Sequence, residues 1–386
     1  MPAGDLASLG ALSRLPFTAA ADVRKRGGEF LAVSQDEIGR AVTAPTSGTT
    51  GAAKRIFFTA ADQEATGGFF RAGLLTFAGR EDRVLLLFPG ERPGSVNDLL
   101  RKELNGLGIP AFTRGDAADL AGVAALMDRE NITVLAGVPG QLLALAKYCR
   151  LAGPVVKLSA VLLSADCAAV AVRREIEAVW DARVFEHYGM TEMGFGGAMQ
   201  CSARRGYHLR EADLYFEIVD PDTGEPRTAG EEGEVVFTTL TQQGMPLIRY
   251  RTGDLARFLG EPCPCGSVLK RIDLITGRVG GAARLPGGGV LTVIDLDDAL
   301  LSLDAVVDYN AVFIAGEPAA RLTVDLKLLG RSSAAVDARL ALGRIPAIAA
   351  AAGRLVVEVG ASMADRLWPV AYAKRTITLK GDGDER

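Results

Sequence analysis

The sequence predicts an α/β protein, with a large N-terminal domain of mainly parallel sheet layers, a small β subdomain and a small C-terminal α+β domain. Three observations support this. Between residues 60 and 190, short apolar runs alternate with amphipathic stretches of helical length. After Gly206, alternating segments rich in β-branched and aromatic residues follow. A glycine-dense segment from Gly277 then sets off the rest of the chain.

The parallel sheet is predicted from apolar runs that are too short for buried helices. The expected strands are 84–88, 133–137, 160–164 and 183–189. The expected helices are 96–107, 119–130, 140–150 and 168–180. Each helix has the length that a crossover between parallel strands requires. We therefore expect a sheet that is covered by helices on both faces.

The remaining elements are β-rich at first and mixed afterwards. Segments 214–220 and 233–240 alternate in hydropathy and are joined by the turn-forming PDTGEP, which predicts a small antiparallel or barrel-like subdomain. The segment GRVGGAARLPGGGVL predicts a hinge or hairpin. We place the domain boundary there, giving domains 1–277 and 278–386, the second with a strand in RLTVDLKLL and a helix in SAAVDARLAL.

Composition excludes several classes of protein. Apolar residues make up 48% and charged residues 23%, which is typical of a soluble globular chain. The formal net charge of −4 is spread without long runs of one sign, so nothing indicates a nucleic-acid partner. No run reaches about 18 apolar residues, and the N-terminus lacks a signal-peptide pattern, so we expect no membrane span and a cytoplasmic location. The five cysteines are too few for a disulfide framework, so they should be reduced or bound to metal.

The sharpest motif is TSGTTGAAK, which ends at Lys54. Its expected phosphate-binding residues are Thr46, Ser47, Gly48, Thr49, Thr50 and Gly51. Glycines let the backbone approach a phosphate closely, hydroxyl and N–H groups donate hydrogen bonds, and Lys54 adds a mobile positive charge. The motif lacks the G-K-[ST] ending of a Walker loop. The structural alternative is a flexible surface loop.

At this loop the chain resembles the adenylate-forming superfamily of acyl-CoA synthetases, peptide-synthetase adenylation domains and luciferases. Further motifs of that superfamily follow in its order: LLSAD at 162–166, YGMTE at 188–192, YRTGD at 250–254 and the pair Gly277-Arg278. Within it, LSRLPFTAAADVRK, PDTGEP and PCPCG are most similar to phenylacetate-CoA ligases. The resemblance covers most of residues 10–280, and the chain starts late relative to that family's N-terminal helical segment.

The resemblance implies a set of nucleotide-binding residues. The adenine contacts would come from Ser164, Ala165, Asp166, Tyr188, Gly189 and Met190, and the ribose contacts from Asp254 and Arg278. Tyr188 offers a flat face for stacking, and Asp254 accepts hydrogen bonds from ribose hydroxyls. Taken singly, Tyr188 could be a core aromatic residue and Asp254 a turn former.

The implied catalytic residues are Lys54, Thr191, Glu192 and Lys374. Thr191 would donate to the α-phosphate, and Glu192 would hold Mg²⁺ against phosphate oxygens. Glu192 could alternatively be a helix-start carboxylate. The family's C-terminal G-K-x-x-R is here Ala371 to Arg375, with Tyr372 at the position of the lysine, so either adenylation is slow or Lys374 substitutes. Gly280 and Gly281 replace the family's acidic pair after the hinge arginine.

A metal site is also expected. Cys201, His208, Cys263 and Cys265 supply three thiols and one imidazole, a complete tetrahedral set for a structural Zn²⁺. Some phenylacetate-CoA ligase relatives are known to bind zinc at the corresponding positions. The alternative is that the cysteines are small buried hydrophobic residues.

The resemblance implies an ATP-dependent enzyme that activates a carboxylic acid as an acyl-adenylate and transfers the acyl group to coenzyme A. An aromatic or arylacetic acid is the family default, and Gly194, Gly196 and Gly197 could leave room for a ring. His187 is interpreted as a packing residue because no triad partner is evident. The alternatives are a catalytically impaired binding protein for a nucleotide or acyl-AMP, and an adenylating enzyme that loads a carrier protein or amine. The oligomeric state stays open, with a homodimer as one alternative.

Overall fold

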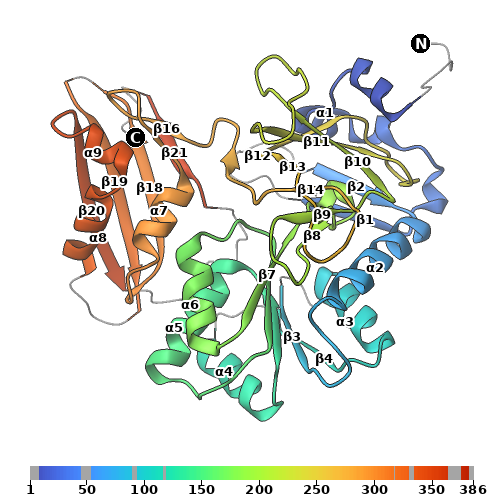
Figure 1. Ribbon diagram of the computed structural model, residues 1–386, viewed down its shortest axis with the longest axis horizontal. Helices are drawn as coiled ribbons and strands as arrows, with labels where there is room; N and C mark the ends of the chain where they lie inside the picture. Colours follow the sequence, from blue (N-terminus) through green and yellow to red (C-terminus); the bar gives the residue numbers. More distant parts are fainter. Residues whose placement is uncertain are drawn as a thin grey trace. The chain divides into compact units, whose positions relative to one another are not determined.

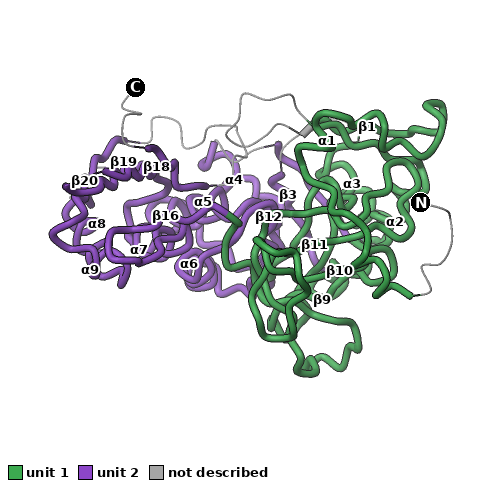
Figure 2. The backbone as a smooth tube through the Cα atoms, turned by 90° about the horizontal axis from the view of Figure 1, so that it is seen from above, with its two compact units in different colours: residues 1–80, 92–108, 185–279 green, residues 81–91, 109–184, 280–386 purple. Residues whose placement is uncertain are grey.

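A computed structural model of the chain describes residues 8–44, 54–88, 94–115, 119–316, 318–329, 334–363 and 375–381. The chain forms two compact units, each built from separate stretches of sequence (Figure 2). The first unit comprises 1–80, 92–108 and 185–279, and the second comprises 81–91, 109–184 and 280–386. Figure 1 labels their helices and strands.

The first unit contains two antiparallel sheets and the antiparallel strands of a nine-stranded sheet. Strands β1 (Arg40–Ala44) and β2 (Lys54–Phe58) form a two-stranded ribbon. The second sheet has the order β10 (Leu214–Val219), β11 (Gly233–Thr239), β12 (Tyr250–Ala256) and β15 (Gly277–Arg278). The antiparallel strands of the nine-stranded sheet follow the order β13 (Phe258–Leu259), β14 (Arg271–Ile272), β9 (Tyr207–Leu209), β8 (Ala198–Met199) and β7 (Arg183–Tyr188). The predicted strands of the β subdomain are confirmed at β10 and β11.

The helices of the first unit lie in its N-terminal half and in one inserted segment. They are α1 (Ala20–Arg26), α2 (Ala60–Leu74) and α3 (Val96–Gly106), with short 3₁₀ turns η1 (Leu9–Arg14), η2 (Gly27–Phe30), η3 (Gln35–Glu37) and η4 (Thr191–Met193). Helix α2 begins after Thr59, whose hydroxyl accepts a hydrogen bond from the Asp62 amide at 3.1 Å. The Asp62 carboxylate accepts in return from the Thr59 amide at 2.8 Å. This reciprocal capping fixes the start of α2 directly after β2.

In the second unit, four parallel strands pair in the order β6-β5-β3-β4. They are β3 (Val84–Leu87), β4 (Ala111–Thr113), β5 (Val134–Gly137) and β6 (Ala160–Leu163). Helices α4 (Leu120–Arg129), α5 (Pro139–Ala152) and α6 (Val170–Trp180) accompany them. The predicted strands 84–88, 133–137 and 160–164 and the predicted helices 119–130, 140–150 and 168–180 are confirmed within about two residues. Strands β3, β5 and β6 are buried at every position, as parallel strands covered on both faces should be.

The C-terminal part of the second unit has its own four-stranded sheet. Its order is β20 (Leu355–Met363), β19 (Ala320–Leu328), β18 (Val306–Ile314) and β21 (Ile377–Lys380), and β16 (Ala283–Arg284) and β17 (Val290–Leu291) form a separate hairpin. Its helices are α7 (Val293–Leu300), α8 (Ala334–Gly343) and α9 (Pro346–Ala350) (Figure 1). The α+β prediction for this part is confirmed.

The C-terminal residues share one hydrophobic core with the parallel sheet of the second unit. The core cluster runs without a break from Leu85 and Leu143 through Trp180 to Leu296 and Val324. The two compact units therefore do not follow the predicted boundary between residues 277 and 278. That boundary, which concerns how the hinge divides the chain, stays a prediction.

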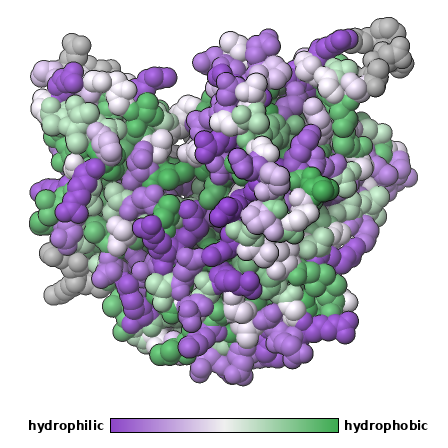
Figure 3. Space-filling model, in the orientation of Figure 1, coloured by the Kyte–Doolittle hydropathy of each residue, from purple (hydrophilic) through white to green (hydrophobic). Residues whose placement is uncertain are grey.

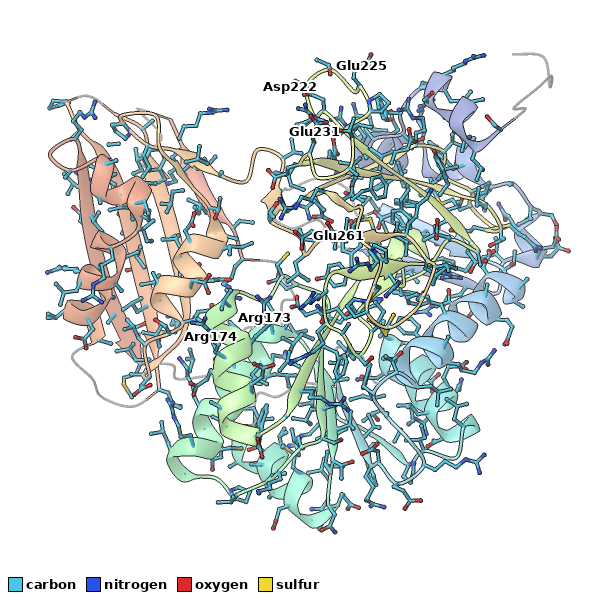
Figure 4. All side chains as sticks on the ribbon, in the orientation of Figure 1. Arg173, Arg174, Asp222, Glu225, Glu231 and Glu261 are labelled. Atoms are coloured by element: carbon cyan, nitrogen blue, oxygen red, sulfur yellow. The ribbon has the colours of Figure 1, made fainter. Side chains whose placement is uncertain are left out.

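Polar and apolar side chains are interspersed over the visible face of the molecule (Figure 3). Among the residues that the structure describes, no helix combines the length and the apolar character that a membrane span requires. The loop between β10 and β11 carries the acidic residues Asp222, Glu225 and Glu231, whereas Arg173 and Arg174 lie on α6 (Figure 4). The PDTGEP turn is therefore a charged surface loop.

Candidate active site

The predicted phosphate loop falls between strands β1 and β2 in the sequence. Its residues Thr46 to Gly51 fall outside the described residues, but both flanking strands are described. Ala44 pairs with Lys54 as the last rung of the ribbon. Lys54 is therefore the first residue of β2, and the ribbon fixes its position in the first unit.

Lys54 and Glu192 form an ion pair. The Glu192 side chain is 4% exposed and the Lys54 side chain 18% exposed. The Tyr250 hydroxyl donates to Oε1 of Glu192 at 2.8 Å and accepts from Nζ of Lys54 at 3.2 Å. Lys54 and Glu192, which belong to different sequence motifs, thus both contact Tyr250. Tyr250 had been assigned no role from the sequence. Strand β2, turn η4 and strand β12 each contribute one of these three residues.

A second cluster lies further along β12. Asp254, which is 1% exposed, accepts from the Tyr188 hydroxyl at 3.1 Å and pairs with the Arg278 guanidinium at 3.0 Å. Arg278 faces Asp254 across the β12–β15 pairing and also donates to the Thr252 carbonyl at 3.0 Å. Burial, followed by the Asp254 charge, raises the pKa of Tyr188 well above its ordinary value, so the phenol remains a donor. The three predicted nucleotide contacts Tyr188, Asp254 and Arg278 are therefore joined in one network.

Strand β12 contributes a residue to each cluster, Tyr250 to the first and Asp254 to the second. Tyr250, Thr252 and Asp254 are buried, while the residues between them are half-buried. The pairing of β12 with β11 shifts register between Arg251 and Leu255, where Gly253 has a left-handed backbone with φ of 75°.

Residues Gly189 to Thr191 connect β7 to η4. A Cβ on Gly189 would lie 2.1 Å from the carbonyl oxygen of Phe195, so glycine is needed there for the protein's own backbone packing. Phe195 and Met193 donate backbone hydrogen bonds to the Met190 carbonyl at 2.9 and 3.0 Å. The loop is consequently a tight, self-bonded turn, and the nucleotide contacts of Gly189, Met190 and Thr191 stay predictions.

Three glycines follow this turn, and the sequence predicted space for a substrate ring beside them. Other side chains of the protein occupy that space. A Cβ on Gly196 would lie 2.3 Å from the Phe69 ring, one on Gly197 would lie 2.5 Å from the Met193 sulfur, and one on Gly194 would lie 2.8 Å from the Thr66 hydroxyl. The expectation that these glycines leave space for a substrate ring is therefore wrong for this structure. They accommodate side chains of the protein itself.

His187 packs as expected from the sequence. Its ring centroid lies 5.3 Å from that of Phe70 and 6.0 Å from that of Phe69. Burial lowers the pKa of His187 to about 3, so the imidazole is neutral at physiological pH.

The predicted adenine loop belongs to the second unit. Ser164, Ala165 and Asp166 follow β6, and Ala165 has a left-handed backbone with φ of 74°. In the same unit Arg375 pairs with Asp297 at 2.9 Å. Burial lowers the pKa of Arg375, but the carboxylates of Asp297 and Asp166 more than offset it, so the pKa is raised overall. Lys374 lies outside the described residues.

The predicted metal ligands converge in the first unit. One ligand atom from each of Cys201, His208, Cys263 and Cys265 lies within 4.8 Å of all the others. The Cys201 and Cys263 sulfurs are 3.5 Å apart, and the Cys265 sulfur lies 3.4 Å from Nε2 of His208. With zinc–sulfur bonds of about 2.3 Å, tetrahedral ligands lie about 3.8 Å apart, so the donor set and its spacing fit zinc.

The thiols of this cluster have unequal pKa values. Burial raises the pKa of Cys201 to about 11. Burial also opposes ionisation of Cys263, yet its pKa is lowered overall because the Cys265 amide and the neighbouring thiols hydrogen-bond to its sulfur. The Cys263 thiol is therefore more readily ionised for metal binding than the Cys201 thiol.

Sequence reasoning missed Tyr250 as a site residue. It lies within YRTGD, four residues before Asp254. Its place in that motif was the available signal. Its contact with Glu192 depends on tertiary packing across 58 residues.

Comparisons with known proteins agree with these motifs. A family profile described as AMP-binding enzyme matches residues 20–241. The phenylacetate-coenzyme A ligase of Thermus thermophilus is 30% identical over 330 residues, which cover 79% of this chain and 69% of that protein. The corresponding ligase of Aromatoleum evansii is 31% identical over 283 residues, which cover 71% of this chain and 62% of that protein.

A solved structure shows the same fold. The crystal structure of a 2-hydroxyisobutyryl-CoA ligase in the postadenylation state superposes with a TM-score of 0.79 at 19% identity. The match covers 98% of this chain and 82% of that one. The α/β class predicted from the sequence is thereby confirmed.

Proposed function

Because this chain belongs to the family of AMP-binding, adenylate-forming enzymes, we propose that it is an AMP-forming acid–thiol ligase. It would activate a carboxylic acid with ATP as an acyl-adenylate and transfer the acyl group to coenzyme A. The observation that carries this proposal is that Lys54 and Glu192 meet at Tyr250 of β12, while Arg278 pairs with Asp254 of the same strand. A cation and a carboxylate for the phosphates and a buried acceptor for the ribose are what adenylation requires.

The residues have complementary roles in this scheme. The substrate carboxylate attacks the α-phosphorus of ATP, and pyrophosphate leaves as the new acyl–phosphate bond forms. Lys54 would follow the charge on the leaving pyrophosphate, and Asp254 would accept hydrogen bonds from the ribose hydroxyls. Glu192, which pairs with Lys54 in this structure, would hold Mg²⁺, and the ion would neutralise phosphate charge. Thiolate attack on the acyl carbonyl would then release AMP.

We further propose an aromatic or arylacetic acid as substrate. Support comes from the two relatives described above, which are both named phenylacetate-coenzyme A ligases. In the first unit, a hollow lined by Phe58, Thr66, Met193 and Arg210 has a volume of about 20 Å³, enough for a water molecule but not for a ring. Binding of such an acid in this hollow would therefore require side chains to move.

The structural zinc site is part of the same proposal. Cys201, His208, Cys263 and Cys265 would hold the ion with no position left for water or substrate, so it would stabilise the fold around β9 and β14 without entering the reaction.

One experiment tests the proposal as a whole. ATP–pyrophosphate exchange is measured across a library of aromatic, arylacetic and aliphatic acids, and products are analysed with coenzyme A present. We expect exchange with at least one aromatic acid and formation of its thioester. Nucleotide binding without exchange would favour the binding-protein alternative. Exchange without a coenzyme A thioester would favour loading of a carrier protein or amine.

A further inference from the structure

The hydroxyl of Tyr250 lies at the meeting point of the proposed phosphate and metal groups. It donates to Oε1 of Glu192 at 2.8 Å, and Nζ of Lys54 donates to it at 3.2 Å. Lys54 is also within 5.9 Å of the centre of the Tyr250 ring. The same phenol therefore contacts both charged groups on which the proposed adenylation depends.

The phenol is held rigidly. Tyr250 is 2% exposed and opens β12, which lies between β11 and β15 in its sheet. Its backbone pairs with Phe237, and the two rings have centroids 5.4 Å apart. On its other side, Tyr250 forms an isolated bridge with Thr18. A side chain fixed by pairing on both sides and by ring packing holds its hydroxyl in one place, which is what preorganisation of a site requires.

The phenol is also fixed as a donor. Its single proton points to Oε1 of Glu192, and its lone pairs are left for the Lys54 ammonium.

The proposed reaction creates a problem that this geometry answers. Lys54 must reach the phosphates and Glu192 must reach the metal, but in this structure they neutralise one another. When the pair opens, a carboxylate that is 4% exposed would lose its cation, and an unpaired buried charge is costly. A donor that stays in place on Oε1 would limit that cost and would leave Oε2 free.

We propose that Tyr250 is a positioning residue that holds Oε1 of Glu192 while Lys54 moves from Glu192 to the phosphates, so that Oε2 is presented to the metal. This inference rests on the proposed function. It predicts that the hydroxyl matters for metal binding beside the nucleotide and not for recognition of the acid.

The test compares Tyr250→Phe with Tyr215→Phe. Tyr215 lies on β10 of the same sheet and is only half-buried, which makes it a matched control for loss of a phenol hydroxyl. Mn²⁺ binding in the presence of α,β-methylene-ATP is measured by electron paramagnetic resonance, without turnover. A lost hydrogen bond to a charged group predicts Mn²⁺ binding weaker by about 10-fold in Tyr250→Phe and unchanged in Tyr215→Phe. Exchange should slow by about 10-fold while the KM for the acid stays constant.

A double-mutant cycle shows whether the effect passes through Glu192. In a Glu192→Gln background, Tyr250→Phe should weaken Mn²⁺ binding by less than about 2-fold, because the two residues act as one unit. A full additional loss would overturn the inference. Tyr250→Met, which fills the buried space without a donor, replaces Tyr250→Phe if thermal unfolding shows that the latter does not fold.

The outcomes separate this inference from the proposed function. If the wild type binds Mn²⁺ with the nucleotide and catalyses exchange, but Tyr250→Phe matches it in both, only the role of Tyr250 fails. If the wild type shows neither nucleotide-dependent Mn²⁺ binding nor exchange with any acid, the proposed function fails and the role of Tyr250 fails with it.

Discussion

The ammonium of Lys147 donates a hydrogen bond of 2.7 Å to the carbonyl oxygen of Val306, the first residue of β18. It donates two more, of 2.8 and 2.7 Å, to Leu301 and Leu303, which follow the end of α7. Burial lowers the pKa of Lys147 to about 8, so at neutral pH the ammonium still supplies three donors. One side chain on α5 therefore satisfies three carbonyls of the C-terminal part of the second unit.

We predict that Lys147→Met lowers the free energy of unfolding by about 3 kcal/mol, because the buried carbonyls lose their donor while the side-chain volume is kept. Urea denaturation at pH 7 measures the change. Lys157 is exposed on the same unit, and Lys157→Met should stay within about 0.5 kcal/mol of the wild type. Equal effects of the two substitutions would contradict the stabilising role of the hydrogen bonds from Lys147 to these carbonyls.

His187 predicts a loss of stability in acid. Its pKa is lowered to about 3 in the folded chain, from an ordinary value of 6.5. Below pH 6.5 the unfolded chain therefore binds a proton that the folded chain does not, and stability falls as the pH drops towards 3. At pH 5 this group alone should cost about 2 kcal/mol.

Urea denaturation of the wild type and of His187→Gln at pH 7 and pH 5 tests this. The variant should lose less stability between the two pH values, by about that amount. His208, whose pKa burial also lowers, is present in both proteins and cancels in the comparison. An identical loss in both proteins would show that His187 does not cause it.

The zinc proposal predicts about one zinc per chain in protein purified without a chelator. Cys263→Ser should lose the metal and unfold at lower temperature, because a structural ion contributes directly to folding. Cys167→Ser removes a thiol in the second unit, outside the proposed zinc site, and this variant should keep the zinc. Elemental analysis and thermal unfolding measure both variants, and metal-free wild-type protein of unchanged stability would end the proposal.

The local elements could be predicted because their period is written in the sequence. The buried strand at 134–137 and the helix at 139–152 follow from an apolar run and an amphipathic stretch. The hydrophobic period of a segment does not determine which surfaces of the helices and strands pack together. The contact of Lys147 with Val306 spans 159 residues, and nothing local to either residue indicates it.

The site shows the same limit. Residue type and the family resemblance together were enough to propose Cys201 and Cys263 as partners, because thiols have a specific metal chemistry. The space beside Gly196 could not be predicted, because Phe69, which fills it, lies 127 residues earlier on α2. A small residue indicates room only where no other side chain of the fold occupies it.

We predict that Lys54→Ala and Glu192→Gln each slow ATP–pyrophosphate exchange by about 100-fold or more, because single charge-stabilising groups commonly contribute about 3 kcal/mol to a transition state. Lys25→Ala, which removes an exposed lysine on α1, should exchange like the wild type. Wild-type rates in both site variants would refute the assignment of these two residues.

The last prediction concerns Tyr372 and Lys374, which lie outside the described residues. In the family, a C-terminal lysine is expected to assist adenylation only, and the sequence predicts Tyr372 at its position. The first half-reaction should then be slow, while a chemically supplied acyl-adenylate is still converted to the thioester. Tyr372→Lys should speed adenylation, because an ammonium stabilises charge developing on the phosphate and bridging oxygens.

Lys374 offers the competing explanation, since it could supply the ammonium itself. In that case Lys374→Ala should abolish exchange and Tyr372→Lys should do little. Single-turnover measurement of both half-reactions in the two variants decides between them, because thioester formation from supplied acyl-adenylate serves as an internal control for folding and for coenzyme A binding. If neither substitution alters adenylation and the wild type converts no acyl-adenylate, the ligase proposal fails, and a protein that binds the nucleotide without turning it over takes its place.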